Sequence, residues 1–184
     1  MVSATLPGGR VQAERAAKTR RAGRVERCRE RSPRATGWPQ RVDWRLLRIL
    51  DANLNRAREG LRVCEDVARL GYDDPALTER LKRARHGVTA AGRRLPVPWH
   101  LLLAARGSDR DVGCPTGQLG PHRRGTVRTL FIVNMQRAKE ALRVLEEGCR
   151  LIAPSVSRSF ARLRFRLYAI EATFAQRRHA LRHR

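Results

Sequence analysis

The sequence carries one 21-residue pattern twice, and this repetition restricts the possible folds more than any other feature. The two strings are LDANLNRAREGLRVCEDVARL at residues 50–70 and FIVNMQRAKEALRVLEEGCRL at residues 131–151. At an offset of 81 they are identical at 10 of 21 positions. Two unrelated amphipathic helices would share a hydrophobic rhythm, but not also one Asn, three Arg and two Glu in the same order. The pattern therefore indicates an internal duplication.

Cap and stop signals predict a helical hairpin around the first copy. Asp43 is a suitable N-cap for a helix from Trp44 to about Leu70, and the glycine that follows is a stop signal. Asp74 and Pro75 then form a cap and a first helical residue for a second helix, which runs to about residue 94.

The second copy repeats this arrangement. A helix is predicted over about residues 126–152, a Pro-Ser pair breaks the chain, and a last helix is predicted over about residues 156–182. The string RLKRARHGV at residues 80–88 aligns with RLRFRLYAI at residues 162–170 at an offset of 82. The duplicated unit is therefore a hairpin and not a single helix.

These elements predict the fold class, since no stretch alternates apolar and polar residues as a sheet strand does. The fold is expected to be all-α, a helical bundle of two duplicated αα-hairpins with pseudo-twofold symmetry. The hairpins cover about residues 44–95 and 126–182 of a single domain over residues 43–184. A segment with a short helix at LLLAAR and a polar loop at residues 107–125 joins them.

Residues 1–42 differ in composition from the rest. They contain 11 Arg or Lys against 3 Glu and very few large apolar side chains, so they cannot bury enough surface to offset their ordering entropy. We expect a disordered, Arg-rich tail; a start codon assigned too far upstream is the alternative.

The net charge of +23 does not by itself predict a nucleic-acid-binding protein. Only Lys18, Lys82 and Lys139 are lysines among the 40 basic residues, and an Arg bias of this kind arises in GC-rich genomes without selection for a polyanion. Charge alone reads no base sequence, so no specific nucleic acid is predicted as a partner.

The cysteines and the hydropathy point to an ordinary cytoplasmic protein. The four cysteines form no C-x-x-C pair, and Cys64 and Cys149 fall at different positions of the two repeats, as small core residues would. No apolar run has transmembrane length, and no secretory signal is recognisable, so no membrane association is expected.

A helical wheel places small residues on one stripe of each repeat helix, including Asn53, Ala57 and Gly60 in the first copy. Such a stripe allows close approach of two helices, so the repeat helices are expected to pack on each other. Arg56 and Arg137 lie on the shoulder of the stripe. The Asn-x-x-Arg pairs either join the two repeats or face a ligand pocket between them.

The wheel places the Glu-Arg-Glu triplets of the two copies on the opposite face. They are interpreted as i,i+3 ion pairs on a solvent-exposed helix surface. The triplets are Glu59, Arg62 and Glu65 in the first copy and Glu140, Arg143 and Glu146 in the second.

The loop ARGSDRDVG at residues 105–113 is a candidate polar site. Asp109 and Asp111 are suitable ligands for a hard divalent cation, and Arg106 is suitable for a phosphate. The alternative is a polar turn with Asx caps. Phosphate-binding glycine loops, zinc-binding helices and nucleophile elbows have no matching motif in the sequence.

The strings RILDANLNRAREGLRVCEDVARL, LKRARH, LLAARGSDRDVG and NMQRAKEALRVLEE occur in an order that resembles a known family. This is the small helical hydroxymethylpyrimidine-phosphate kinase family of thiamin biosynthesis, found fused ahead of thiamine-phosphate synthase and also alone. The likeness covers about residues 45–175. It implies ATP-dependent phosphorylation of 4-amino-5-hydroxymethyl-2-methylpyrimidine phosphate to the diphosphate, which a separate thiamine-phosphate synthase would use. The chain departs from the family at Val67 and Gly107.

Phosphoryl transfer needs cations around the phosphates, and this requirement indicates the site residues. Arg56, Arg137 and Arg106 are expected to bind phosphates, Asp109 and Asp111 to hold Mg²⁺, and Asn53 and Asn134 to bind the pyrimidine or the hairpin interface. ATP and Mg²⁺ are the expected cofactors. The alternatives are a non-catalytic helical partner of thiamine-phosphate synthase and a basic nucleic-acid-binding helical protein; homodimer formation is left open.

Overall fold

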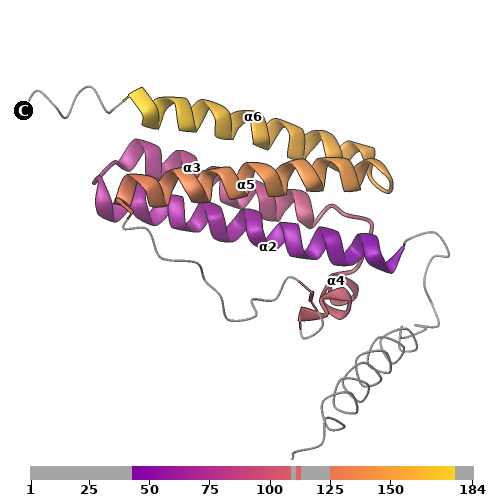
Figure 1. Cartoon of the computed structure of the whole chain (residues 1–184). Coiled ribbons are helices and arrows are strands. Elements are labelled where there is room, and N and C mark those ends of the chain that lie inside the picture. Colours follow the sequence, from indigo (N-terminus) through magenta and orange to yellow (C-terminus); the bar gives the residue numbers. More distant parts are fainter. Residues whose placement is uncertain (1–42, 109–110, 113–124, 177–184) are drawn as a thin grey trace, which may run out of the picture. The chain divides into compact units, whose positions relative to one another are not determined.

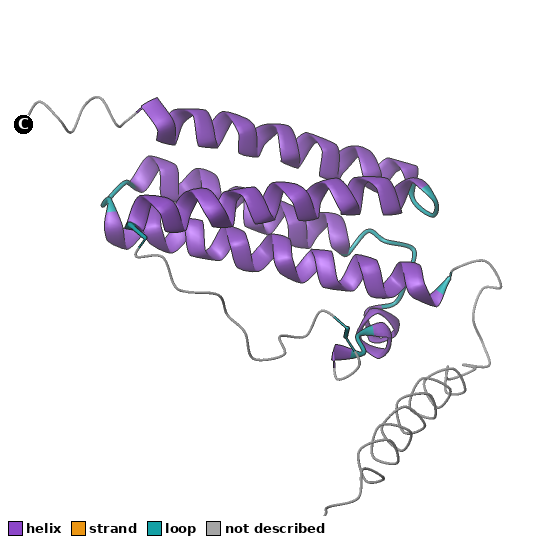
Figure 2. Cartoon of the chain, viewed as in Figure 1, coloured by secondary structure: helices purple, strands orange, loops and turns teal. Residues whose placement is uncertain are grey.

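A computed structural model of the chain describes residues 43–108, 111–112 and 125–176. Every regular element within these ranges is helical, which confirms the all-α prediction (Figure 2). The predicted tail over residues 1–42 lies outside the described residues. The elements are α2 (Trp44–Asp66), the π-helical turn η1 (Val67–Gly71), α3 (Pro75–Gly92), α4 (Trp99–Ala105), α5 (Val127–Arg150) and α6 (Pro154–Gln176).

The helices begin where capping side chains satisfy their first free N–H groups. The Asp43 Oδ1 accepts from the Arg45 N–H at 2.8 Å, and the Asp74 Oδ1 accepts from the Leu77 N–H at 3.0 Å. Both caps were expected from the sequence, and Pro75 occupies the first position of α3 as predicted. Thr126 caps α5 in the same way.

The helix ends differ in detail from the sequence prediction. The regular α-helix of the first copy ends at Asp66, and the chain continues as the π-helical turn η1, which ends at Gly71. α3 ends at Gly92, two residues earlier than predicted, and α6 begins at Pro154 instead of Val156. The predicted C-terminal end of the last helix, at residue 182, lies outside the described residues.

α2 and α5 pack against each other in antiparallel directions, with α3 beside α2 and α6 beside α5 (Figure 1). Their backbones are closest at Gly60, where a Cβ atom would lie only 2.8 Å from the Asn134 carbonyl oxygen and 3.4 Å from the Ala138 Cβ. Further along, the Cys64 thiol donates to the Phe131 carbonyl at 3.4 Å. The predicted packing of the two small-residue stripes is therefore confirmed.

The two copies occupy equivalent environments in this pair of helices. Every buried position of α5 corresponds, at an offset of 81, to a buried position of α2 or η1. The Asn53 amide donates to the Ile49 carbonyl and the Asn134 amide to the Leu130 carbonyl, both at 2.8 Å. The burial pattern and the polar contacts therefore follow the same repeat.

The second helices of the hairpins align differently from the sequence prediction. α3 and α6 begin at Pro75 and Pro154, which are 79 residues apart. At this offset all five buried positions of α3 match buried positions of α6; the pairs are Leu77/Val156, Leu81/Phe160, Ala84/Leu163, Val88/Leu167 and Ala91/Ile170. At the predicted offset of 82, the buried Ala84 would correspond to the exposed Arg166.

The predicted alignment of residues 80–88 with 162–170 is therefore wrong by three residues. A shift of three residues is close to one helical turn, so many apolar positions still align with apolar positions. The identical residues in the shifted alignment are coincidental. The offset falls from 81 to 79 because the connection between the two helices is two residues shorter in the second copy.

A buried glutamate joins the two helices of each hairpin. Glu65 of α2 accepts from Arg85 of α3 at 2.8 Å, and Glu146 of α5 accepts from Arg164 of α6 at 2.9 and 3.1 Å. Both glutamates are 5 % exposed. Buried charges of this kind need close partners, because desolvation is otherwise costly.

The Glu-Arg-Glu triplets are therefore not simple surface ladders, as the sequence analysis expected. Glu65 and Glu146 are core residues. Arg62 contacts Glu65 at 3.6 Å and Asp66 at 3.1 Å, and Arg143 makes the equivalent pairs with Glu146 and Glu147. The first glutamate of each triplet faces another direction, described below.

Substitution of Gly60 by alanine tests the close approach of α2 and α5. The added methyl group would meet a backbone oxygen that cannot rotate away, so the helices must separate. We expect Gly60→Ala to lower the free energy of unfolding by about 1–3 kcal/mol, although alanine favours the helix. Gly87→Ala is the control, because its methyl group meets only the flexible end of Leu163. Equal stabilities in urea denaturation would contradict this interpretation.

The buried glutamate of the second hairpin supports a second prediction. Glu146→Ala leaves Arg164, whose side chain is 13 % exposed, without its carboxylate. We expect a loss of about 3–5 kcal/mol in the free energy of unfolding. Glu79→Ala removes an exposed ion pair with Arg83 and should cost less than about 1 kcal/mol. Similar losses in both variants would show that the burial of Glu146 does not determine how much its ion pairs contribute to stability.

Candidate functional site

The first candidate site is a pocket at the centre of the α2–α5 contact, which we call the axis pocket. Its volume is about 490 Å³. Both copies contribute an Asn, an Arg and a Glu at the same repeat positions, so the pocket lies where the two copies meet. The lining residues are Asn53, Arg56, Glu59 and Gly60 from α2 and Asn134, Arg137, Glu140, Ala141 and Val144 from α5.

Asn53 and Asn134 are each 7 % exposed, and their amide groups are oriented by their own helices. Each Nδ2 donates to the carbonyl four residues earlier, so one N–H of each amide is already satisfied. Neither side chain forms a hydrogen bond to the opposite repeat within the described ranges. Of the two alternatives left open by the sequence, this geometry favours a pocket over a polar link between hairpins.

Arg56 and Arg137 reach the pocket from opposite helices and are both exposed. In the part of the chain that the structure describes, neither guanidinium has a hydrogen-bond or ion-pair partner. The repeat arginines thus fall into two classes, because Arg62 and Arg143 are both paired with carboxylates. Unpaired guanidinium groups in a shared pocket are suited to bind an oxyanion.

Glu59 and Glu140 also line the axis pocket, which the sequence analysis missed. It assigned them to the opposite face because they lie three residues before Arg62 and Arg143. They lie equally three residues after Arg56 and Arg137, and that spacing was the available signal. The formal charges of the two arginines and two glutamates cancel, and the pocket offers both anion-binding and cation-binding groups.

Arg106, which was expected to bind a phosphate, is bound to a buried carboxylate. Its guanidinium makes two bonds with Asp51, Nε to Oδ2 at 2.7 Å and Nη2 to Oδ1 at 2.9 Å, and Asp51 is only 2 % exposed. Arg48 donates to the Gly107 carbonyl at 3.0 Å. These contacts hold the segment after α4 against α2.

The pKa of Arg106 is raised by its hydrogen bond with Asp51 and further by the charges of Asp51 and Glu59. Glu59 also lines the axis pocket. The observed partner of Arg106 is nevertheless Asp51, so a phosphate would have to compete with that ion pair.

The expected metal ligands are only partly described. Asp109 lies outside the described residues, and Asp111 is exposed, with its N–H donating to the Ser108 carbonyl at 3.4 Å. Within the described ranges, no group of three or more His, Cys, Asp or Glu side chains is placed to hold a metal ion. The assignment of Mg²⁺ to Asp109 and Asp111 stays a prediction.

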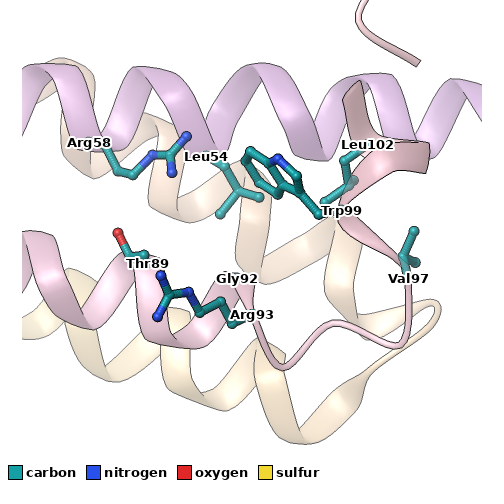
Figure 3. A pocket seen from close by; sticks show the side chains of 8 residues that line it. All are labelled: Leu54, Arg58, Thr89, Gly92, Arg93, Val97, Trp99 and Leu102. Atoms are coloured by element: carbon teal, nitrogen blue, oxygen red, sulfur yellow. The ribbon is translucent and has the colours of Figure 1, made fainter. Parts of the chain in front are cut away.

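A second pocket, which was not predicted from the sequence, lies between α2, α3 and α4 (Figure 3). We call it the α4 pocket; its volume is about 340 Å³. In Figure 3 the guanidinium groups of Arg58 and Arg93 are at one end and Trp99 is toward the other. The remaining lining residues are Leu54, Thr89, Gly92, Val97 and Leu102.

Cys64 and Cys149 are buried core residues with free thiols, as expected. Burial raises the pKa of Cys64 to about 12 and that of Cys149 to about 11, so neither thiol is a nucleophile at neutral pH. They are not part of the candidate site.

The sequence profile of the ThiD2 family matches residues 48–173, which include both repeats and the segment between them. The chain belongs to the ThiD2 family. No solved structure matches this ThiD2 chain.

Longer proteins named thiamine-phosphate synthase are similar to this ThiD2 chain. One from Synechocystis sp. is 41 % identical over 129 residues, covering 69 % of this chain and 35 % of its own length. One from Thermosynechococcus vestitus is 41 % identical, with shares of 69 % and 34 %, and one from Nostoc punctiforme is 34 % identical, with shares of 77 % and 39 %. The ThiD2 chain thus spans about a third of these relatives.

None of its described helices has the length and hydropathy needed to cross a bilayer.

Substitution of Arg106 tests whether it anchors the segment after α4. Arg106→Gln leaves the buried Asp51 carboxylate without its cation, so we expect a loss of about 1–3 kcal/mol in the free energy of unfolding. The double variant Asp51→Asn/Arg106→Gln should recover part of this loss, because both groups are then neutral. Urea denaturation of the two variants measures the difference. An unchanged stability in Arg106→Gln would leave the arginine available for a ligand.

Proposed function

We propose that this ThiD2 protein acts in thiamin biosynthesis as a kinase. It uses ATP and Mg²⁺ to phosphorylate 4-amino-5-hydroxymethyl-2-methylpyrimidine phosphate to the diphosphate. Membership of the ThiD2 family and the names of the relatives support the pathway. The observation that carries the reaction class is the axis pocket, where Arg56 and Arg137 face one shared space and have no carboxylate partner among the described residues.

The residues of the axis pocket fit the chemistry of phosphoryl transfer, which depends mainly on positioning and charge neutralisation. The planar forks of Arg56 and Arg137 suit phosphate oxygens through two parallel hydrogen bonds. An Asn side chain offers a donor and an acceptor, which matches the ring nitrogen and amino group of an aminopyrimidine. Asn53 and Asn134 are held by their own helices and supply this pattern from both sides.

The carboxylates near the axis pocket fit a divalent cation and the substrate hydroxyl. Glu59 and Glu140 line the pocket, and Asp109 and Asp111, the predicted Mg²⁺ ligands, follow Arg106 in the sequence. Mg²⁺, when bound with ATP, neutralises charge on the phosphate oxygens. One of the pocket glutamates is suitably placed to accept the proton of the attacking hydroxyl.

A second candidate function is a non-catalytic role beside thiamine-phosphate synthase. It is favoured by one observation: the chain matches only about a third of proteins that carry the synthase name. This function would keep the helical repeats but would require neither ATP nor unpaired arginines. Under the kinase proposal, a separate synthase is the partner that receives the diphosphate.

The deciding experiment incubates the purified chain with Mg-ATP and the pyrimidine monophosphate. We expect formation of ADP and the pyrimidine diphosphate, followed by coupled ADP detection and by chromatography. A folded sample that forms neither product would refute the kinase and leave the non-catalytic role. Turnover of the unphosphorylated alcohol at the same rate would show that the pocket is not specific for the monophosphate.

Arg56→Lys and Arg137→Lys test the axis pocket, because they keep the charge and remove the fork. Each should reduce transition-state stabilisation by about 2–4 kcal/mol, measured as kcat/KM, with little change in melting temperature. Arg62→Lys and Arg143→Lys are matched controls, since these repeat arginines are paired outside the pocket. The controls should retain activity.

The opposite pattern would identify a structural role. If Arg56→Lys and Arg137→Lys lower the melting temperature but not the rate per folded molecule, the arginines brace the hairpins. If only one variant loses activity, one copy kept the site and the other retains the packing. Wild-type kinetics in both variants would show that the axis pocket is not the catalytic site.

A further inference from the structure

The two repeats differ in the residues that surround the α4 pocket. Its lining from α2 and α3 includes Leu54, Arg58, Thr89 and Gly92. At the structural offsets of 81 and 79, the counterparts on α5 and α6 are Met135, Lys139, Tyr168 and Glu171. The first copy therefore lacks the Tyr and Glu side chains that the second copy has at these positions.

In the second copy, the equivalent space is filled by its own side chains. The Lys139 ammonium contacts the Glu171 carboxylate at 2.6 Å and lies 5.4 Å from the centre of the Tyr168 ring. The Lys139 side chain is only 12 % exposed. The cation of this copy is therefore neutralised and covered.

In the first copy, the corresponding cation, Arg58, has no carboxylate partner among the residues that the structure describes. Gly92 stands where Glu171 would be, and Thr89 stands where Tyr168 would be, so a charge and a ring are both missing. Within the described ranges, Arg58 donates to the Asn55 side chain and lies over the Trp99 ring, whose centre is 5.7 Å from its Cζ. The missing side chains leave the α4 pocket open.

A second cation and an aromatic ring complete the α4 pocket. The exposed Arg93 side chain has no hydrogen-bond or ion-pair partner among the residues that the structure describes. Trp99, from the segment between the two repeats, is 50 % exposed although it is a large apolar side chain. Leu54 and Leu102 are buried and give the pocket an apolar floor.

We propose that the α4 pocket binds a planar aromatic heterocycle that carries a phosphate group. The ring would pack against Trp99 and the apolar floor, and the phosphate would be held by Arg58 and Arg93. The volume of about 340 Å³ falls in the range of small-molecule sites, roughly 300–1,000 Å³. Inorganic phosphate alone would use the arginines but leave the apolar lining uncovered.

This site shares no lining residue with the axis pocket, so its occupation does not depend on the kinase proposal. Two compounds named under that proposal belong to the expected class, an adenine nucleotide and the pyrimidine monophosphate. They share the ring-plus-phosphate chemistry, and a binding experiment distinguishes them.

Isothermal titration calorimetry of the full chain tests the proposal with ADP and with the pyrimidine monophosphate, in separate titrations. We expect at least one to bind with a Kd below about 1 mM, and adenosine or inorganic phosphate to bind at least tenfold more weakly. The preferred compound identifies the ring. If neither compound binds, or if inorganic phosphate binds equally well, the proposal is wrong.

Two substitutions locate the binding. Gly92→Glu restores the carboxylate of the second copy beside Arg58, and Arg93→Gln removes the second cation. Each should weaken binding at least tenfold. Arg94→Gln is the matched control, because the Arg94 side chain turns to Ser159 at 3.3 Å, and it should bind normally. A Cβ on Gly92 would lie 3.0 Å from the flexible end of Leu54, so melting curves verify that this variant folds.

Binding that persists in Arg93→Gln would place the ligand elsewhere and overturn the proposal. The results can distinguish a failure of this proposal from a failure of the kinase proposal. Ligand binding that depends on Arg93 in a chain without kinase activity would support the α4 pocket alone. Kinase activity that depends on Arg56 and Arg137, without binding at Arg93, would support the axis pocket alone.

Discussion

The close antiparallel contact of α2 and α5 is the constraint on which the rest of the structure depends. Because Gly60 carries no side chain, the backbones approach to a distance that one methyl group would prevent. At this separation the large side chains of the contact cannot lie between the helices, so Arg56 and Arg137 are displaced to its edge. The short Asn53 and Asn134 fit beside the contact and turn their amides to their own helices. The axis pocket is thus a direct result of close helix packing.

The hairpin contacts and the axis pocket use different charged residues of the same repeat. Glu65 and Glu146 are buried and joined to arginines of the neighbouring helix, so they fix each hairpin internally. The pocket glutamates lie about one and a half turns earlier on the helix and are exposed. This separation means that the pocket residues can change while the hairpins remain intact. The α4 pocket is an example of such a change. The second copy fills the equivalent space with Lys139 and Glu171, and the first copy leaves it open.

Much of the scaffold was predictable because its signals are local. Caps such as Asp43 and Asp74 and the small-residue stripe act over a few neighbouring residues, and all three appear as expected. The pairing of Asn53, Arg56, Asn134 and Arg137 followed from the repeat. Features that depend on distant residues were missed. The partner of Arg106 is 55 residues away in the sequence, and the α4 pocket needs a tryptophan from outside the repeats. The alignment of α3 with α6 depends on a connection whose length differs between the copies.

The position of the axis pocket also affects how a ligand can lie in it. A molecule at the centre of two matching helices meets an Asn, an Arg and a Glu from either direction, so it can enter in two opposite orientations of similar energy. A reaction requires one of them, because only one end of the substrate reacts. Features present on one side must therefore make the choice. Val144 lines the pocket without its counterpart Val63, and Arg106, which holds Asp51, comes from the segment between the repeats. In a symmetric pocket, the residues that break the symmetry determine the direction of the chemistry.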